Sequence, residues 1–342
     1  MYVIFGYLGA VVGAGFVSGQ EVVQFFVQYG RLGWWGAIIA ALLFALLGGI
    51  LMQIAHHHNI SNYQDLLKLL FTSKFANIIE LLLAGFLFLG ISIMLSASGA
   101  IFIEHLNLPK FAGILIMCTV VFIALLSGKS GLVASYNYLV PLKIIMLISI
   151  NLYLAFGVKN QSGLNYMAML DNPNDFRWLA AAVLYIAYNF TLAMVVLVEY
   201  QSITTKRQSI RGAIIGGAFL GGMVLLNFWA LAKSIPQIFA YEIPMLFATG
   251  KISLSVKYCY LLVLWLGILT TAIANTYGFT QRVSKYSGIN FKIMLCISLG
   301  AALPISWQSF SDLVGLVYPV FGIVGTIIIS ALIYQHIKDI AL

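Results

Sequence analysis

Long apolar segments separated by short polar stretches make up most of this chain. Ten such segments approach the roughly 20 residues that a helix needs to cross a bilayer. Their approximate limits are 2–29, 33–55, 76–103, 111–127, 131–157, 178–200, 210–233, 256–282, 291–307 and 312–336. The third is long, and the fourth and ninth are short. The pattern predicts an all-α polytopic membrane protein with about ten transmembrane helices.

Two intervals do not fit this pattern. Segment 158–177 is polar and contains Asn160, Asp171, Pro173 and Asp175, so we expect a surface loop outside the membrane. Segment 236–251 contains two prolines and a glutamate and is too short to span a bilayer. We expect it to form a small lid helix lying on the membrane face.

The first apolar segment is interrupted half way by the run Gly13-Ala14-Gly15-Phe16-Val17-Ser18-Gly19-Gln20-Glu21. A glycine lowers helix stability by up to about 1 kcal/mol relative to alanine, and an ionised side chain at bilayer depth costs roughly 3 kcal/mol or more. Backbone that leaves the helix at this depth is tolerated only where it faces protein or water. Discontinuous helices of this kind mark the solute site of secondary transporters. We therefore expect a functional break within residues 13–19.

The sixth segment carries a second polar interruption, Ala187-Tyr188-Asn189-Phe190-Thr191. Two interrupted segments, each opening a set of five, are typical of an inverted 5+5 repeat. The repeats would be residues 1–157 and 178–342, joined by the extracytoplasmic loop 158–177 in one transmembrane domain. The alternative is that Asn189 and Thr191 simply bridge neighbouring helices. The spacings Gly212-x-x-x-Gly216 and Gly217-x-x-x-Gly221 in the seventh segment predict close helix packing.

Composition and charge narrow the class of protein. The chain of 342 residues is 62% hydrophobic and only 8% charged, with a mean hydropathy of +1.00, which excludes a soluble globular domain. Its basic residues lie mostly in short loops, where they set orientation, so the net charge of +8 is no sign of a nucleic-acid partner. If the N-terminus is cytoplasmic, the inner loops and tail hold ten Lys and Arg residues and the outer loops hold seven. This excess of positive charge inside predicts a cytoplasmic N-terminus.

The run from Gly13 to Glu21 resembles the first-helix motif of YkvI-type bacterial membrane proteins, amino-acid permeases of the amino acid–polyamine–organocation superfamily, and Tyr188-Asn189-Phe190-Thr191 fits their sixth helix. The resemblance covers most of the chain in layout, with its specific motifs in segments one and six. It implies a LeuT-type fold with broken helices 1 and 6, located in the bacterial cytoplasmic membrane. It also implies transport of an amino acid or similar small solute, coupled to H⁺ or Na⁺.

A broken first helix would supply a solute site. Free N–H groups near Val17–Gln20 and the positive end of the helix dipole suit a carboxylate, and carbonyls around Ala10–Ala14 suit a cation. Phe16, Tyr185, Tyr188 and Phe190 could wall the pocket. The residues that we assign to solute binding are Gly13, Ala14, Gly15, Phe16, Ser18, Gly19, Gln20, Tyr188, Asn189 and Thr191.

Two alternatives for the coupling ion stay open. Gly267, Thr270 and Thr271 share one face of the eighth segment, and residues at this spacing in LeuT-fold proteins hold Na⁺; the alternative is that the threonines bond their own backbone. Lys143 lies mid-way along the fifth segment and resembles the lysine that replaces Na⁺ in some proton-coupled relatives. It could instead pair with Glu21, which we also assign to ion coupling and whose role stays open.

Two other motifs give weaker evidence of a functional site. His56-His57-His58 ends the second segment, but adjacent histidines diverge around a helix, so we assign no metal and expect no cofactor. Ser127-Gly128-Lys129-Ser130 resembles the end of a phosphate loop, yet Ile123 stands where its first glycine is required. We therefore expect a secondary active transporter and not an enzyme. The alternative is a solute-sensing receptor on the same fold. Oligomeric state and solute identity have no signal in the sequence.

Overall fold

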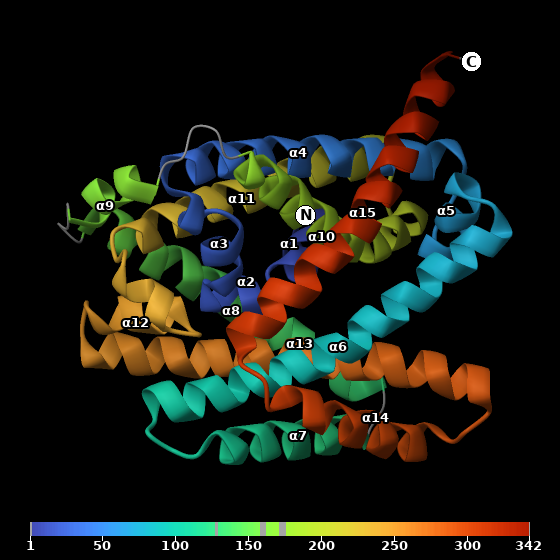
Figure 1. Cartoon of the computed structure of the whole chain (residues 1–342). Helices are drawn as coiled ribbons and strands as arrows, with labels where there is room; N and C mark the ends of the chain where they lie inside the picture. Colours follow the sequence, from blue (N-terminus) through green and yellow to red (C-terminus); the bar gives the residue numbers. More distant parts are fainter. Residues whose placement is uncertain (1, 127–128, 158–161, 171–175, 342) are drawn as a thin grey trace.

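The computed structural model describes residues 2–126, 129–157, 162–170 and 176–341, and every regular element within them is a helix (Figure 1). The α-helices are α1 (Tyr2–Val11), α2 (Ala14–Ser18), α3 (Gln20–Phe25), α4 (Gly30–His57), α5 (Tyr63–Leu70), α6 (Ser73–His105), α7 (Lys110–Leu126), α8 (Lys129–Leu152), α9 (Ser162–Leu170), α10 (Arg177–Leu197), α11 (Lys206–Ala232), α12 (Pro244–Gly250), α13 (Leu254–Ser287), α14 (Phe291–Ser306) and α15 (Phe310–Ala341). Short 3₁₀ or π turns are η1 (Val27–Tyr29), η2 (Tyr153–Gly157), η3 (Val198–Ile203) and η4 (Gln237–Ala240).

All ten predicted segments correspond to helical elements. Among the described residues, six helical stretches are long and apolar enough to cross a membrane, and shorter apolar helices occupy 2–11, 110–126, 141–157 and 291–306. The chain is therefore an all-α polytopic membrane protein. Segment 236–251 contains η4 and α12, as expected of a short non-spanning element. The expectation of a plain loop at 158–177 is wrong where α9 forms, and residues 158–161 and 171–175 lie outside the described part.

The helices form two groups joined by two long helices. The first group contains α1, α4, α10 and α11, and the second contains α6, α7, α13 and α14; within each group the helices pack against one another. In Figure 1, α4 and α11 run along the upper side and the second group runs along the lower side. Helix α15 packs against α10, α4 and α6, while α8 packs against α11, α7 and α13, so each contacts both groups.

The closest packing in the first group is between α4 and α11. A Cβ atom added at Gly221 would lie 2.3 Å from the Cα of Ala41, and one at Gly217 would lie 2.5 Å from the carbonyl carbon of Phe44. The two helices are antiparallel, because the later glycine meets the earlier residue of α4. The predicted close packing at the Gly-x-x-x-Gly spacing is confirmed, since only hydrogen fits between these backbones.

The molecule has two ends, marked by α5 and α9 on opposite sides of Figure 1. At the α5 end, Arg282 of α13 donates to the hydroxyl of Tyr63 at 2.5 Å, and Tyr63 donates to Glu80 of α6 at 3.2 Å. Burial raises the pKa of the Tyr63 phenol, so it keeps the proton that it donates. These bonds tie α5, α6 and α13 together at this end.

Candidate functional site

The first helix is interrupted twice. Helix α1 ends at Val11, Gly13 is extended (φ −83°, ψ −174°), and α2 begins at Ala14. The second interruption is Gly19, whose φ of +81° lies in the left-handed region that favours glycine. The predicted break is confirmed in position. The expected free N–H groups are wrong for Val17 and Gln20, which donate to the carbonyl of Gly13 at 3.1 Å and the hydroxyl of Ser18 at 3.2 Å.

Side chains from three other helices bond the carbonyls around this break. Lys143 of α8 donates to the carbonyl of Val12 at 2.5 Å. Asn227 of α11 donates to that of Phe16 at 3.2 Å, and Tyr260 of α13 donates to that of Val17 at 2.6 Å. A buried carbonyl released from a helix costs free energy unless it finds a donor. The broken backbone is therefore held open by α8, α11 and α13 together.

Lys143 and α13 meet at the first interruption, in what we call the break cluster: Val12, Gly13, Lys143, Gly267 and Thr271. Lys143 is buried, with 3% of its surface exposed. Its Cδ lies 3.3 Å from where a Cβ of Gly267 would stand, and the Thr271 hydroxyl lies 3.9 Å from the corresponding position at Gly13. Lys143 and the Gly267–Thr271 face, which the sequence offers as alternatives for the coupling ion, thus lie at the same place, and Lys143 donates to Val12 rather than to Glu21.

The two threonines of α13 bond their own helix. The hydroxyl groups of Thr270 and Thr271 donate to the carbonyl of Gly267 at 2.8 and 3.1 Å. This is the arrangement expected when threonine in a transmembrane helix satisfies its hydroxyl locally. The face that Gly267, Thr270 and Thr271 share is therefore present, with both hydroxyl protons directed at one carbonyl.

A second cluster surrounds Glu21, and we call it the carboxyl cluster: Gly15, Gln20, Glu21, Tyr188 and Asn189. Glu21 is 3% exposed, and a Cβ added at Gly15 would lie 2.2 Å from its Oε1 atom. The side chains of Tyr188 and Asn189 lie beside its carboxyl group. Among the described residues, Glu21 Oε2, Gln20 Oε1 and the Tyr188 hydroxyl are buried without a hydrogen-bond partner. Buried polar atoms without partners are rare and mark a place where a ligand or water can bind.

The predicted break in the sixth segment is wrong. Helix α10 runs without interruption through 187–191 and changes to 3₁₀ geometry only at Val198. The side-chain amide of Asn189 donates to the carbonyl of Tyr185 at 3.1 Å, and Thr191 donates to that of Ala187 at 2.7 Å. Both polar groups thus bond their own helix. Thr191 lies against α15, where a Cβ at Gly325 would come within 2.8 Å of its hydroxyl.

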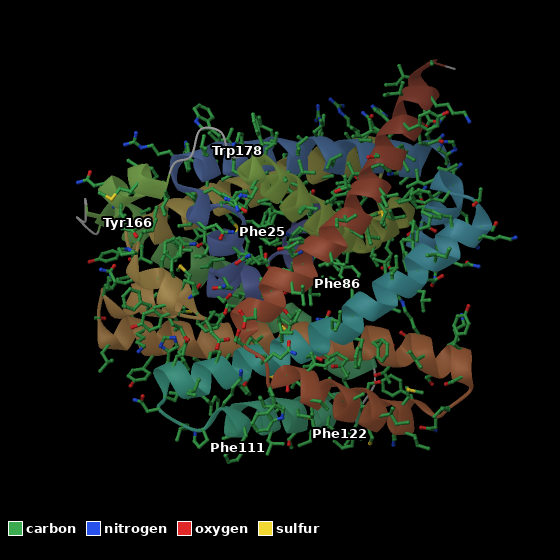
Figure 2. All side chains as sticks on the ribbon, in the orientation of Figure 1. Phe25, Phe86, Phe111, Phe122, Tyr166 and Trp178 are labelled. Carbon is green, nitrogen blue, oxygen red and sulfur yellow. The ribbon has the colours of Figure 1, made fainter. Side chains whose placement is uncertain are left out.

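Aromatic side chains enclose the carboxyl cluster. The ring of Phe25 lies 5.5 Å from that of Tyr185 and 5.6 Å from that of Tyr188, and Tyr188 lies 4.8 Å from Tyr318 of α15. Figure 2 shows Phe25 within the helix assembly. Phe16 and Phe190, which were predicted to wall the site, are fully buried.

Several of these contacts escape sequence reasoning. Four residues that contact the site are not among those predicted from the sequence: Asn227, Tyr260, Phe25 and Tyr318. Asn227 is a lone amide in an apolar run, which is a usable signal. Tyr260 has no such signal, because a tyrosine near a membrane surface is common whatever its role.

A cavity of about 540 Å³ lies beside the carboxyl cluster, and we call it the vestibule. Its walls are α3 and η1, the segment of η4, and the start of α15. The residues that line it are Gln20, Val23, Gln24, Gln28, Ile238, Phe239, Ala240, Tyr241, Glu242, Ser311, Asp312, Gly315 and Leu316. These include two acidic residues, Glu242 and Asp312, and neither lysine nor arginine, so the lining of the vestibule carries negative charge. Gln20 belongs to both the vestibule and the carboxyl cluster.

Comparison with known proteins gives relatives along nearly the whole chain. No model of a protein family matches the sequence. The uncharacterised membrane protein YkvI of Bacillus subtilis strain 168 is 32% identical over 333 residues, which cover 96% of this chain and 94% of YkvI. The uncharacterised protein YyaD of the same organism is 23% identical over 334 residues, 96% of this chain and 95% of YyaD.

Two solved structures share the fold at low sequence identity. Mhp1, a nucleobase–cation symport-1 family transporter in a closed conformation with bromovinylhydantoin bound, matches with a TM-score of 0.56 and 15% identity, over 92% of this chain and 73% of Mhp1. The manganese transporter of Eremococcus coleocola matches with a TM-score of 0.58 and 14% identity, over 94% and 75%. These likenesses assign a LeuT-like fold. The identity to YkvI along almost the full length shows that this multi-pass membrane protein belongs to the YkvI family.

Proposed function

We propose that this protein is a secondary active transporter that moves an amino acid or similar small solute by alternating access, driven by protons. The observation that carries the proposal is the buried ammonium group of Lys143, bonded at 2.5 Å to the carbonyl of Val12 at the break in the first helix. A lysine buried in a membrane protein is costly and is kept where it serves function. Here it reaches a backbone region that leaves helical geometry within the membrane.

The break cluster favours H⁺ over Na⁺ as the coupling ion. Carbonyl and hydroxyl oxygens of Val12, Gly267 and Thr271 are chemically suited to a hard cation. The ammonium of Lys143 already supplies a cation beside them, and the hydroxyl of Thr271 donates to Gly267. Loss of the lysine proton would remove charge from this position and weaken the bond to Val12. Protonation is thereby linked to the conformation of the break, which is the requirement for coupling.

The carboxyl cluster is the proposed solute site. Glu21 is buried, and its Oε2 atom has no hydrogen-bond partner in the described part of the chain. None of the ion pairs between described residues includes Glu21. A buried carboxylate without a cation is unfavourable, so the ammonium group of an amino acid or amine would bind it well. Tyr188, Asn189 and Gln20 offer further polar atoms. The hydroxyl of Ser18 donates to the carbonyl of Gly15 at 2.8 Å, so Ser18 would face solute as a hydrogen-bond acceptor through its oxygen.

The remaining assigned residues shape the site. Gly13 and Gly19 set the two interruptions, while Ala14 and Phe16 lie fully within the buried helix between them. Gly15 leaves room for the Glu21 carboxyl group. Thr191 contacts α15 instead and is the least supported member of the predicted solute site. The vestibule is the route by which solute reaches Glu21, and the α5 end is the closed, cytoplasmic side with both chain termini.

The inverted repeat is supported by the pattern of helix contacts. Exchanging α1, α4, α6, α7 and α8 for α10, α11, α13, α14 and α15 maps several of the helix contacts onto one another, although among the described residues the packing of α10 against α15 has no comparable counterpart between α1 and α8. For example, α4 packs against α10 as α11 packs against α1, and α8 packs against α13 and α11 as α15 packs against α6 and α4. We therefore propose that residues 1–157 and 178–342 are the two repeats of one transmembrane domain. Alternating access by rocking of one helix group against the other follows from this architecture.

The test is uptake by the purified protein in sealed liposomes. Pools of radiolabelled amino acids and of small amines are presented with an inward proton gradient, with a sodium gradient, or with neither. Saturable uptake that requires the proton gradient and is indifferent to Na⁺ is expected. Solute binding detected by thermal stabilisation but without uptake under any gradient would contradict transport and favour the sensing receptor. Uptake driven by sodium alone would overturn the role of Lys143 as the coupling group.

A further inference from the structure

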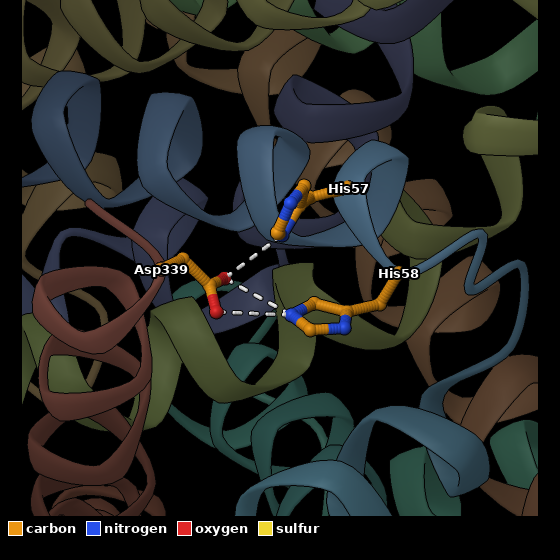
Figure 3. Close-up of side chains that lie close together, drawn as sticks. All are labelled: His57, His58 and Asp339. Carbon is orange, nitrogen blue, oxygen red and sulfur yellow. Dashed lines mark hydrogen bonds and ion pairs between the residues drawn. The ribbon is translucent and has the colours of Figure 1, made fainter. Parts of the chain in front are cut away.

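A cluster of metal-binding side chains lies at the α5 end, away from the proposed solute site. His57 Nδ1 is 3.5 Å from Asp339 Oδ2, and His58 Nε2 is 3.0 Å from the same oxygen and 3.1 Å from Oδ1 (Figure 3). The potential ligand atoms of the three residues all lie within 4.8 Å of one another. The cluster joins the end of α4 to the end of α15, two helices far apart in sequence.

The two histidines converge because the helix stops between them. Side chains of adjacent residues diverge inside a regular helix, which is the reason for assigning no metal to this run from the sequence. Helix α4 ends at His57, and His58 is its C-cap with φ −98° and ψ 5°. The ring centroids of His57 and His58 are 4.8 Å apart. The ring of His56 points away from them, and its Nε2 atom lies 2.8 Å from the hydroxyl oxygen of Ser209 in α11. The structure therefore gives the triplet two separate roles.

The ligand types and spacings suit a transition metal. Zinc binds imidazole nitrogen and carboxylate oxygen at about 2.0–2.2 Å, so neighbouring ligands of a tetrahedral ion stand roughly 3.3 Å apart. The contacts of 3.5 and 3.0 Å from Asp339 Oδ2 to the histidine nitrogens are close to this spacing. Gln335 donates to Asp339 Oδ1 at 2.7 Å and so orients the carboxylate, as partners of metal ligands commonly do.

A small cavity makes the cluster accessible. Its volume is about 190 Å³, and its lining includes His57, Asp339 and His336, which could supply a further nitrogen. The side chains of His57, His58 and Asp339 are 57%, 28% and 12% exposed, so an ion can enter from the surface. Lys206 of α11 also lines the cavity and opposes a cation electrostatically. The site would therefore hold its ion less tightly than a fully anionic one.

We propose that His57, His58 and Asp339 bind a divalent transition-metal ion of the zinc class and so fasten α4 to α15. The site is separate from the solute site, and its metal is a ligand of the protein rather than its cargo. Because α4 belongs to the first helix group and α15 contacts both groups, the bound ion would link parts of the molecule that no backbone connection joins at this end. The inference does not depend on the transported solute.

Calorimetric titration of the tag-free, full-length protein in detergent with Zn²⁺ tests the proposal. The expected result is one Zn²⁺ per chain, with affinity lowered roughly tenfold or more in both His57→Ala and Asp339→Asn. His56→Ala is the matched control, since its ring bonds Ser209, and it should bind as the wild type does. Lys206→Ala should bind more tightly, because a neighbouring positive charge is removed.

The melting temperature provides a second test, which remains informative if one of the variants is destabilised. Zn²⁺ should raise the melting temperature of the wild type, because an ion that binds only the folded state stabilises it. It should leave that of Asp339→Asn unchanged, provided that the metal-free melting temperatures agree. Equal Zn²⁺ affinity in wild type and both variants, or no affinity in any, would mean that the cluster is a histidine–aspartate ion pair only and would overturn the proposal.

Discussion

The first helix and α10 carry similar polar interruptions at the middle of apolar segments, yet one is broken twice and the other is continuous. The first has glycines at 13, 15 and 19, whereas α10 has none between Arg177 and Leu197. Asn189 and Thr191 bond carbonyls of their own helix. Polar side chains in a membrane helix can thus be satisfied without leaving it. Glycine, which lowers the cost of leaving, distinguishes the two.

The first helix and α10 also differ in which groups donate to their backbone carbonyls. Carbonyls released in the first helix accept from Lys143, Asn227 and Tyr260 of three other helices. In α10, the carbonyls of Tyr185 and Ala187 accept from side chains of their own helix. The broken helix is therefore sensitive to the positions of its neighbours, whereas α10 is continuous from Arg177 to Leu197. In the proposed alternating access, the broken helix would be the part that moves and α10 the surface against which it moves.

The largest expected effect comes from removing the outside donor at the break. Lys143→Ala should abolish proton-driven uptake, because the carbonyl of Val12 loses its partner and the coupling charge is gone. An unpartnered buried carbonyl also costs about 1–3 kcal/mol of stability. Uptake in liposomes is the measurement, with Lys338→Ala, an exposed lysine of α15, as the control. Unchanged, Na⁺-independent uptake by Lys143→Ala would contradict the proposed role of Lys143 in proton coupling.

The second largest effect is expected from filling the space inside the broken helix. Gly15→Val places a side chain where the Glu21 carboxyl group lies, 2.2 Å from Oε1 at Cβ alone. Solute binding, measured by thermal stabilisation, should be lost. The control is Gly222→Val in α11, where an added Cβ meets nothing within 4 Å. Wild-type affinity in Gly15→Val would show that the carboxyl cluster is not the solute site.

A smaller effect is expected at the second interruption. Gly19 has φ +81°, a conformation that costs other residues about 1–2 kcal/mol. An alanine there would also meet Met245 Cγ at 2.8 Å. Gly19→Ala should therefore lower the melting temperature measurably and reduce uptake. An unchanged melting temperature would mean that the kink relaxes into continuous helix without cost, so that α2 and α3 need no break between them.

The smallest effect should be in α10. Thr191→Val keeps the shape of the side chain and removes only a hydroxyl that bonds Ala187 of the same helix. We expect a stability loss of about 1 kcal/mol or less and near-normal solute affinity. A large loss of affinity with intact stability would show that Thr191 contacts solute, and would make α10 a direct part of the site.

Apolar length predicted the helical segments, and glycine predicted the interruption of the first helix, because both are properties of local sequence. Local sequence could not predict that α10 stays intact, since the same threonine can bond a neighbour or its own backbone. Nor could it choose the partner of Lys143. Depth along a helix places Lys143 nearer the level of the break than Glu21, but only the packing of α8 against its neighbours directs it to the carbonyl of Val12.

The contact of Gly217 and Gly221 with α4 also has a mechanical consequence. Backbones in contact cannot slide past one another without separating, so α4 and α11 would move as one unit in any conformational change. Motion is then confined to joints made by side chains. The Tyr63, Arg282 and Glu80 contacts at the α5 end form such a joint, because three hydrogen-bonding groups can part and re-form without any backbone moving through another. The close backbone contact at two glycines would thereby confine a conformational change to the side-chain contacts elsewhere in the molecule.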